Sequence, residues 1–144
     1  MSGRSLRLVV ADDERDTVTT LAAILTDEGH YVMPVYSGPA VLAEVKRVLP
    51  DAVIVDIDMP DISGLSVARE LRRIYGQMSP VLIAISGKFV GETDRMLSEI
   101  AGFHHFLQKP CSPQALLELL APLTQRASRP APDFSATAIR APEL

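Results

Sequence analysis

Five short hydrophobic runs are spaced along the chain, each bounded by turn residues or by acids. They cover residues 6–11, 31–36, 52–55, 81–85 and 103–107. Hydrophobic runs of this length are typical of buried β-strands. Pro34 lies inside the second run and has no backbone N–H to donate, so we expect this strand at the edge of a sheet.

Between the hydrophobic runs, apolar residues recur at helical spacing. The clearest case follows Asp16 and Thr17, which are capping residues, and places Val18, Leu21 and Leu25 on one face. The pattern predicts an amphipathic helix that packs against the sheet.

Similar spacing predicts further helices near 38–48, 65–75 and 92–101, and a last helix that begins at Ser112 and that Pro122 bends or ends. Strands and helices therefore alternate. This alternation predicts an α/β fold with a parallel sheet covered on both faces and right-handed crossovers. Ligands of such sheets bind at the carboxyl ends of the strands.

The composition limits the classes of partner. The chain has 144 residues and a net charge of −4, which argues against direct nucleic-acid binding, because that binding depends on clustered Lys and Arg. The N-terminal apolar stretch is too short for a signal peptide or a membrane span, and the single cysteine, Cys111, fits a reducing compartment. We therefore expect a cytoplasmic protein without membrane contact.

Two regions differ in composition. Residues 1–125 carry the strand and helix pattern and are interpreted as one domain. Residues 126–144 are rich in Ala and Pro and bury too little apolar surface to offset their ordering entropy, so we expect a flexible tail. The tail is too short for an output domain, which leaves open whether the protein acts alone or is a piece of a longer chain.

Polar residues gather at the predicted carboxyl ends of the strands. Asp12 and Asp13 follow the first strand, Asp56 the third, Ser86 the fourth, and Lys109 the fifth. Each residue alone has an ordinary interpretation as a cap, a turn or a surface residue. Together they predict a site, because chance turns would rarely bring three acids, a hydroxyl and a lysine to one edge.

Carboxylates about 5 Å apart repel each other by roughly 3 kcal/mol at an effective dielectric constant of about 20, so a cation is expected among them. Hard oxygen ligands suit Mg²⁺, which commonly bridges carboxylates and a phosphoryl oxygen. Lys109 and Ser86 could hold other oxygens of a phosphoryl group in transfer. Asp56 is then the candidate nucleophile.

The motifs at these strand ends resemble those of the response-regulator receiver domain family of two-component signalling. They are Ala11-Asp12-Asp13-Glu14, Val53-Ile54-Val55-Asp56, Met59-Pro60-Asp61-Ile62-Ser63-Gly64, Ile85-Ser86-Gly87 and Lys109-Pro110. The resemblance spans roughly residues 5 to 125. It implies a flavodoxin-like, doubly wound sheet of five parallel strands in the order 2-1-3-4-5.

The resemblance also implies a metal site. Asp13 would bind Mg²⁺ directly, Asp12 mainly through water, and Asp56 and the backbone carbonyl of Asp58 would complete the protein ligands. Asp56 would receive the phosphoryl group from a phosphohistidine on a histidine kinase or a phosphotransfer protein. Asp58 and Lys88 would flank the path of the hydrolytic water, so we expect Asp58 to influence hydrolysis by its charge.

By the same resemblance, Ser86 and Lys109 would bind the new phosphoryl group, and Phe106 would turn inward as part of a two-state switch. Phe106 stands where many relatives have Tyr, so it offers no phenolic hydroxyl. A downstream protein would dock on the face formed by the helix at 92–101, the fifth strand and the last helix. Met96 and Leu117 lie on that face with Phe106.

Other residues near the site have a structural interpretation. Cys111 follows Lys109-Pro110 and is interpreted as a structural thiol, and His104 and His105 as surface or packing residues. The resemblance describes a signalling domain that catalyses only its own phosphorylation and dephosphorylation.

Two alternatives remain open. Asp56-Ile57-Asp58 is similar to the nucleophile motif of haloacid-dehalogenase-type phosphatases, but there the nucleophile ends the first strand and the acid pair follows the lysine. A pseudo-receiver that binds partners without phosphorylation is the second alternative. The complete acid set, Ser86 and Lys109 argue against it.

Overall fold

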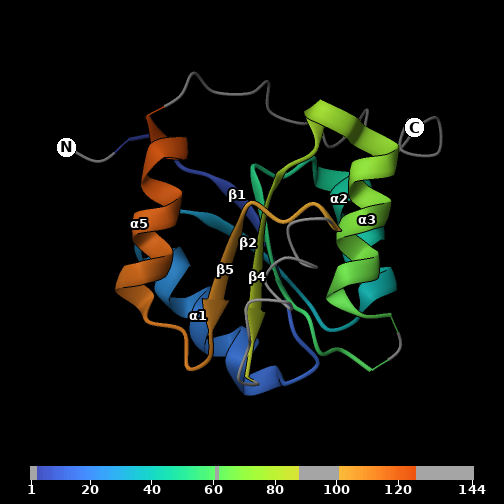
Figure 1. The fold of residues 1–144 in the computed structure, drawn as a ribbon. Helices are drawn as coiled ribbons and strands as arrows, with labels where there is room; N and C mark the ends of the chain where they lie inside the picture. Colours follow the sequence, from blue (N-terminus) through green and yellow to red (C-terminus); the bar gives the residue numbers. More distant parts are fainter. Residues whose placement is uncertain (1–2, 61, 88–100, 126–144) are drawn as a thin grey trace.

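The computed structural model describes residues 3–60, 62–87 and 101–125, in which five parallel strands form one sheet with helices on both faces (Figure 1). The elements are β1 (Arg7–Ala11), α1 (Arg15–Asp27), β2 (Tyr31–Val35), α2 (Gly38–Val48), β3 (Ala52–Asp56), α3 (Gly64–Tyr75), the short 3₁₀ helix η1 (Gly76–Met78), β4 (Val81–Ser86), β5 (His105–Gln108) and α5 (Pro113–Thr124). The strand order is β2-β1-β3-β4-β5, which confirms the predicted doubly wound fold.

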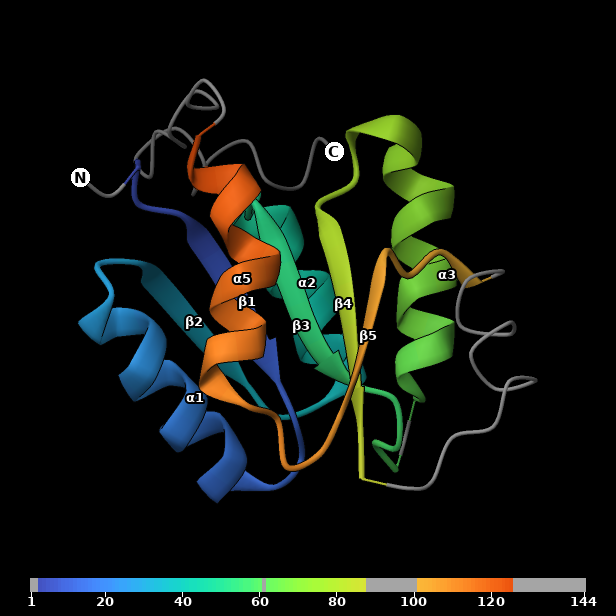
Figure 2. The ribbon, with the colours of Figure 1, turned by 60° about the vertical axis from the view of Figure 1, so that its left-hand side comes forward.

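Two hydrophobic layers cover the sheet, with α1 and α5 on one face and α2 and α3 on the other (Figures 1 and 2). Alternate residues of each strand enter opposite layers, as the twofold repeat of a strand requires. In β3, for example, Ala52 and Ile54 pack with α1 and α5, whereas Val53 and Val55 pack with α2 and α3. Burial on both faces explains why the central strands are continuous hydrophobic runs.

The edge position predicted for the strand with Pro34 is confirmed. β2 pairs with β1 in parallel register, with Val10 opposite Pro34, and it lies at one edge of the sheet. An edge strand tolerates the missing N–H of proline because one side of it has no strand neighbour.

The start of α5 agrees with the prediction, whereas the start of α1 differs from it. Ser112 caps α5 by accepting the N–H of Ala115, and the helix continues to Thr124, two residues beyond Pro122. The expectation that Asp16 and Thr17 cap the first helix is wrong, since α1 begins at Arg15 and both residues lie in its first turn. The negative charge of Asp16 there still favours the helix N-terminus.

Several predicted features lie outside the described residues. They are residues 92–100 of the predicted helix with Met96, the residue Lys88, Asp61 of the acidic motif, and the tail at 126–144. Among the described helices, none combines the length and the hydrophobicity that crossing a membrane requires.

A buried carboxylate ties the N-terminal segment to the start of β3, at the edge of the sheet opposite the predicted site. Asp51 is 4% exposed, and its carboxylate accepts hydrogen bonds from the Arg4 guanidinium at 3.1 Å and from the Arg7 N–H at 2.8 Å. Its backbone N–H donates to the Arg7 carbonyl, and its carbonyl accepts from Val81. Asp51 therefore connects β1, β3 and β4 at the point where these strands begin.

We predict that Asp51→Ala lowers the free energy of unfolding by about 3 kcal/mol, because it removes the acceptor of a partly buried guanidinium and of a backbone N–H. Asp51→Asn should cost less, since its amide oxygen can still accept the Arg7 N–H. Urea denaturation of both variants measures the difference. Equal losses for the two variants would contradict the role assigned to the Arg7 hydrogen bond.

Candidate functional site

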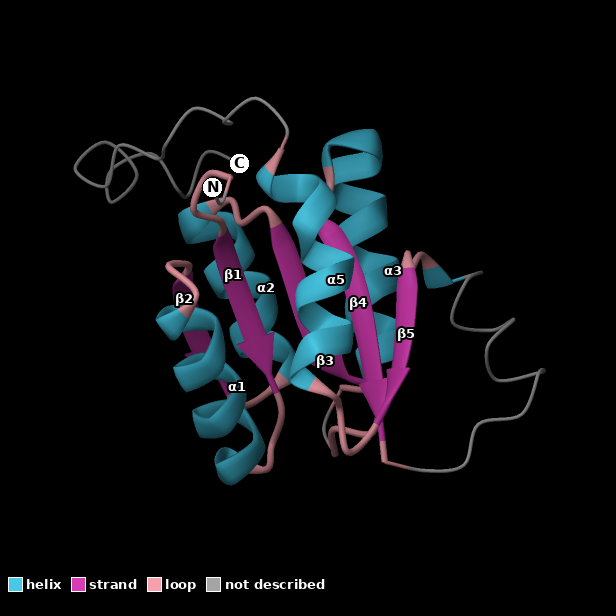
Figure 3. Ribbon diagram, turned by 90° about the vertical axis from the view of Figure 1, so that its left-hand side faces the viewer, coloured by secondary structure: helices cyan, strands magenta, loops and turns pink. Residues whose placement is uncertain are grey.

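The predicted site residues meet at one edge of the sheet. The strands run in the same direction, so their carboxyl ends lie at one edge (Figure 3). β3 ends at Asp56 and β4 at Ser86, while Asp12 follows β1 and Lys109 follows β5. These four strands are neighbours in the sheet, and β1 and β3 flank the position where the strand order reverses. This reversal is where doubly wound sheets bind ligands.

Three carboxylates form a compact cluster. Oxygens of Asp12, Asp13 and Asp56 all lie within 4.8 Å of one another. Asp12 and Asp56 are buried, at 0% and 3% exposure, whereas Asp13 is exposed. Hard oxygen donors gathered at this spacing, with one of them open to solvent, fit a divalent cation that keeps part of its water shell. The acid cluster could therefore bind a metal ion.

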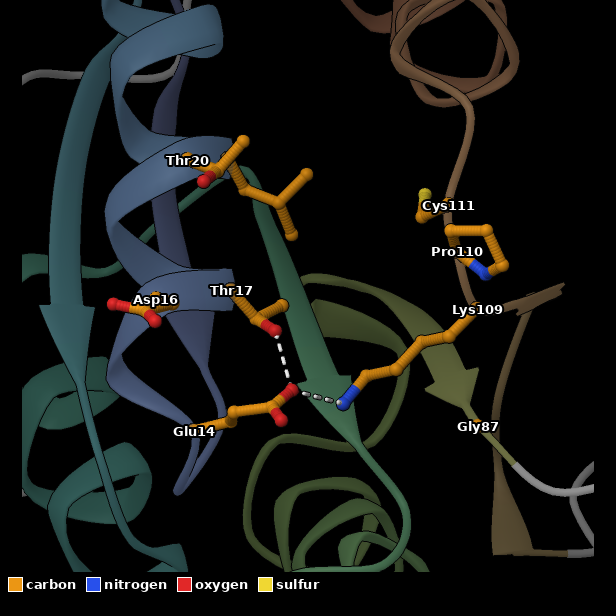
Figure 4. Close-up of a pocket in the computed structure, with 9 residues that line it drawn as sticks. Glu14, Asp16, Thr17, Thr20, Gly87, Lys109, Pro110 and Cys111 are labelled. Atoms are coloured by element: carbon orange, nitrogen blue, oxygen red, sulfur yellow. Dashed lines mark hydrogen bonds and ion pairs between the residues drawn. The ribbon is translucent and has the colours of Figure 1, made fainter.

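Lys109 reaches the cluster from the neighbouring strand end. Its Nζ lies 2.6 Å from Asp12 Oδ2 and 3.6 Å from Asp56 Oδ2. It also lies 3.7 Å from Glu14 Oε1, the contact drawn in Figure 4. Partial burial alone would lower the pKa of Lys109, but the hydrogen bond to Asp12 and the surrounding carboxylates outweigh it, so the pKa is raised. The lysine thus remains a positive charge in the site.

Asp56 experiences opposing influences. Burial raises its pKa most strongly, and the charge of Asp12 raises it further, while the N–H of Asp58 and the charge of Lys109 lower it. The result is a pKa raised to about 6 in the metal-free protein. Asp56 Oδ1 accepts the Asp58 N–H at 3.0 Å, which fixes the orientation of the carboxylate. A cation beside Asp56 would favour its ionised form.

Ser86 has a partner that the sequence did not indicate. Its hydroxyl donates to Asp58 Oδ2 at 2.8 Å, so the Asp58 side chain contacts a residue at the end of β4. The sequence placed Asp58 two residues beyond Asp56 but gave no signal for this contact, because the β3 and β4 loops meet only in the folded chain.

A close backbone approach fixes the loop after Asp56. Gly64 is the first residue of α3, and its N–H donates to the Ile57 carbonyl at 3.0 Å. A Cβ atom at Gly64 would lie 2.7 Å from the Asp56 carbonyl oxygen and 2.8 Å from Ile57 Cα. A side chain at this position therefore requires the backbone of the acidic loop to move.

A cavity of about 440 Å³ opens beside Lys109, between α1 and the segment that joins β5 to α5 (Figure 4). Glu14 and Thr17 line one side of it, and Thr17 donates its hydroxyl to Glu14 at 2.7 Å. Cys111 lines the other side, and burial raises the pKa of its thiol. A raised pKa disfavours the reactive thiolate, which agrees with the structural interpretation of Cys111.

The aromatic and histidine residues of β5 lie at different depths. Phe106 is half-buried and packs against the hydrophobic layer on the α2 and α3 side. His104 and His105 are exposed, and His104 Nδ1 accepts the Leu82 N–H at 2.9 Å. This arrangement agrees with the prediction that the histidines are surface or packing residues.

Comparison with known families gives a match along most of the chain. The model of the response regulator receiver domain family matches residues 8–121. The transcriptional regulatory protein TcrA of Mycobacterium tuberculosis is 35% identical over 127 residues, which cover 88% of this chain and 49% of that protein. The sensory/regulatory protein RpfC of Xanthomonas campestris is 34% identical over 122 residues, which cover 83% of this chain and 17% of that protein. The chain thus spans about half, or less, of the length of these relatives.

Solved structures support the fold. A CheY-like response regulator receiver domain protein from Methanospirillum hungatei superposes with a TM-score of 0.76 at 21% sequence identity. The superposition covers 84% of this chain and 94% of that protein.

We predict that Asp56→Asn stabilises the metal-free protein. The pKa of Asp56 is raised from 3.8 to about 6 on folding, so the folded state holds the proton more tightly and loses stability as pH rises from about 4 through about 6. Removing the charge should raise the free energy of unfolding at pH 7 in EDTA by about 2 kcal/mol.

Urea denaturation with EDTA at pH 4 and pH 7 measures this effect. The matched control is Asp27→Asn, because Asp27 is an exposed carboxylate at the end of α1. The gain of the Asp56→Asn variant should be small at pH 4 and full at pH 7. A gain that is the same at both pH values would contradict the electrostatic explanation.

We predict that Gly64→Ala weakens metal binding by about tenfold or more, since the new methyl group displaces the backbone that carries Asp56. Titration with Mg²⁺, followed by thermal stabilisation, measures this effect. Gly29→Ala is a suitable control for general loss of stability, because Gly29 has a positive φ of 95° but open space around its Cβ position. Unchanged Mg²⁺ affinity in Gly64→Ala would show that the loop tolerates the displacement.

Proposed function

Because the chain belongs to the response regulator receiver domain family, we propose that Asp56 accepts a phosphoryl group from a phosphohistidine and that the resulting change of shape controls a protein partner. Receiver domains are signalling domains that interact with histidine kinases and downstream effectors. The observation that supports the assignment to Asp56 is its position in the acid cluster, within 3.6 Å of Lys109.

The metal assigned to the cluster is Mg²⁺, which would supply positive charge against the carboxylates and the incoming phosphoryl oxygens. Asp13 and Asp56 would bind it directly, and the backbone carbonyl of Asp58 would be the third protein ligand. Asp12 Oδ1 accepts the Glu14 N–H at 3.0 Å, and Asp12 Oδ2 forms an ion pair with Lys109 Nζ at 2.6 Å. This occupancy supports a role for Asp12 through water.

In the transfer, a carboxylate oxygen of Asp56 forms a bond to phosphorus while the bond from phosphorus to the donor imidazole breaks. The imidazole nitrogen keeps the electron pair. The raised pKa of Lys109 keeps its side chain protonated. Its ammonium group can therefore leave Asp12 and Asp56 and form an ion pair with a phosphoryl oxygen. The domain catalyses only this transfer and the later hydrolysis of its own acyl phosphate.

The switch connects Ser86 with Phe106 through two paired strands. β4 and β5 are parallel neighbours, with Ala84 opposite Phe106 and Ser86 opposite Gln108. A movement of Ser86 toward a phosphoryl group on Asp56 therefore acts on the strand beside Phe106. The downstream partner is proposed to dock on β5, α5 and the helix predicted at 92–101, with Phe106 and Leu117 in the contact.

The first experiment is phosphorylation by acetyl phosphate, read by intact mass. We expect one added phosphoryl group in the presence of Mg²⁺ and none in EDTA, because the unneutralised acid cluster repels the phosphoryl oxygens. The Asp56→Asn variant should gain no phosphoryl group under either condition.

Two results would contradict the proposal. Complete absence of phosphorylation, under conditions that modify a control receiver, would favour a pseudo-receiver that binds partners without phosphorylation. Steady turnover of a small phosphoester would favour a haloacid-dehalogenase-type phosphatase. Lys109→Met serves as a further comparison: it should retain the acid cluster but lose the charge beside Asp56.

A further inference from the structure

Asp58 connects the two strand ends that must cooperate in the switch. Its backbone N–H donates to Asp56 Oδ1 at 3.0 Å, and its side-chain Oδ2 accepts the Ser86 hydroxyl at 2.8 Å. The loop after β3 thus holds the phosphoacceptor with its main chain and the hydroxyl of β4 with its side chain. Ser86 is buried at 3% exposure, whereas Asp58 is exposed at the surface end of this connection.

We propose that the Asp58 carboxylate is a positioning residue that holds the Ser86 hydroxyl away from Asp56 in the unphosphorylated protein and so sets how readily the switch changes state. This inference rests on the proposed function, in which a phosphoryl group on Asp56 recruits Ser86. It assigns to the Asp58 side chain a role distinct from metal binding, which the backbone carbonyl of the same residue would serve.

A serine hydroxyl has a single proton to donate. Ser86 can donate that proton to one acceptor at a time, and in this structure the acceptor is Asp58. A hydrogen bond to a carboxylate is stronger than one between neutral groups. A phosphoryl group on Asp56 must therefore compete with Asp58 for the same proton. The switching equilibrium depends on the difference between the two hydrogen bonds.

The two contacts of Asp58 can be separated by substitution. The hydrogen bond to Asp56 comes from the backbone N–H, so every side-chain variant except proline keeps it. Asp58→Asn keeps an acceptor oxygen but removes the charge. Asp58→Ala removes both the acceptor and the charge. The side-chain effect can thus be measured while the loop stays attached to the phosphoacceptor.

The readout is the affinity for beryllofluoride, a phosphoryl mimic, at an Mg²⁺ concentration that saturates each variant. The mimic is not hydrolysed, so its affinity reports the switching equilibrium and excludes any effect of Asp58 on hydrolysis. We expect affinity to rise in the order wild type, Asp58→Asn, Asp58→Ala, with about a tenfold range, as loss of one hydrogen bond to a charged group predicts. Equal affinities for Asp58→Asn and Asp58→Ala would overturn the proposal, because charge alone would then explain the effect.

A double-mutant cycle tests whether Asp58 acts through Ser86. Asp58→Ala should increase the affinity for beryllofluoride by a factor that is at least threefold smaller in the Ser86→Ala background than in the wild-type background. An equal gain in both backgrounds would overturn the proposal. Glu14→Gln removes a negative charge on the α1 side of Lys109, where Glu14 accepts the Thr17 hydroxyl. Its effect should be the same in both backgrounds.

The outcomes distinguish the two proposals. A wild-type protein that binds no beryllofluoride and accepts no phosphoryl group would contradict the proposed function, and the role of Asp58 with it. Normal binding and phosphorylation of the wild type, without coupling between Asp58 and Ser86, would overturn the positioning role alone.

Discussion

The repulsion between buried carboxylates is the constraint on which the site depends. Asp12 and Asp56 are nearly inaccessible to water, yet their oxygens lie within 4.8 Å of each other and of Asp13. At that separation each pair of charges costs roughly 3 kcal/mol at an effective dielectric constant of about 20. Lys109 offsets part of this cost by lying 2.6 Å from Asp12. One lysine cannot neutralise three carboxylates, so the protein alone leaves an excess of negative charge that a divalent cation would balance.

The fold tolerates the carboxylate cluster because packing and hydrogen bonds in other parts of the sheet stabilise the protein. Helices cover both faces of the central strands β1, β3 and β4, so these strands are almost wholly apolar and the polar groups lie at their carboxyl ends. Hydrogen bonds around Asp51 hold the opposite ends of β1, β3 and β4 together. Gly64 then lets α3 begin against the backbone of Asp56, which keeps the acidic loop close to the sheet. The mutually repelling carboxylates are thus held by a sheet whose strands are tightly packed in two hydrophobic layers.

Sequence patterns predicted whatever depends on periodicity and strand order. The hydrophobic runs predicted the five strands, and Pro34 predicted which of them lies at an edge of the sheet. The polar residues that follow the strands predicted which side chains meet at the site. The patterns failed where two loops meet in space. Nothing in the local sequence distinguishes Asp58 as the acceptor of the Ser86 hydroxyl, since the two residues are 28 positions apart. The start of α1 was misplaced for a local reason, because Asp16 suits both a cap and the first turn of a helix.

The contact between Asp58 and Ser86 follows from the same excess of negative charge. A hydroxyl next to several carboxylates donates to whichever one it reaches, and the Asp58 side chain lies within 2.8 Å of it. A phosphoryl group on Asp56 would carry about −1.5 to −2 charges at neutral pH in place of the single carboxylate charge, and it would present three strong acceptor oxygens. It would therefore offer the Ser86 hydroxyl a second acceptor at a different place. The two arrangements then differ by little more than one charge-assisted hydrogen bond. A side chain that takes no part in bond formation can therefore shift the balance between the two states of the switch.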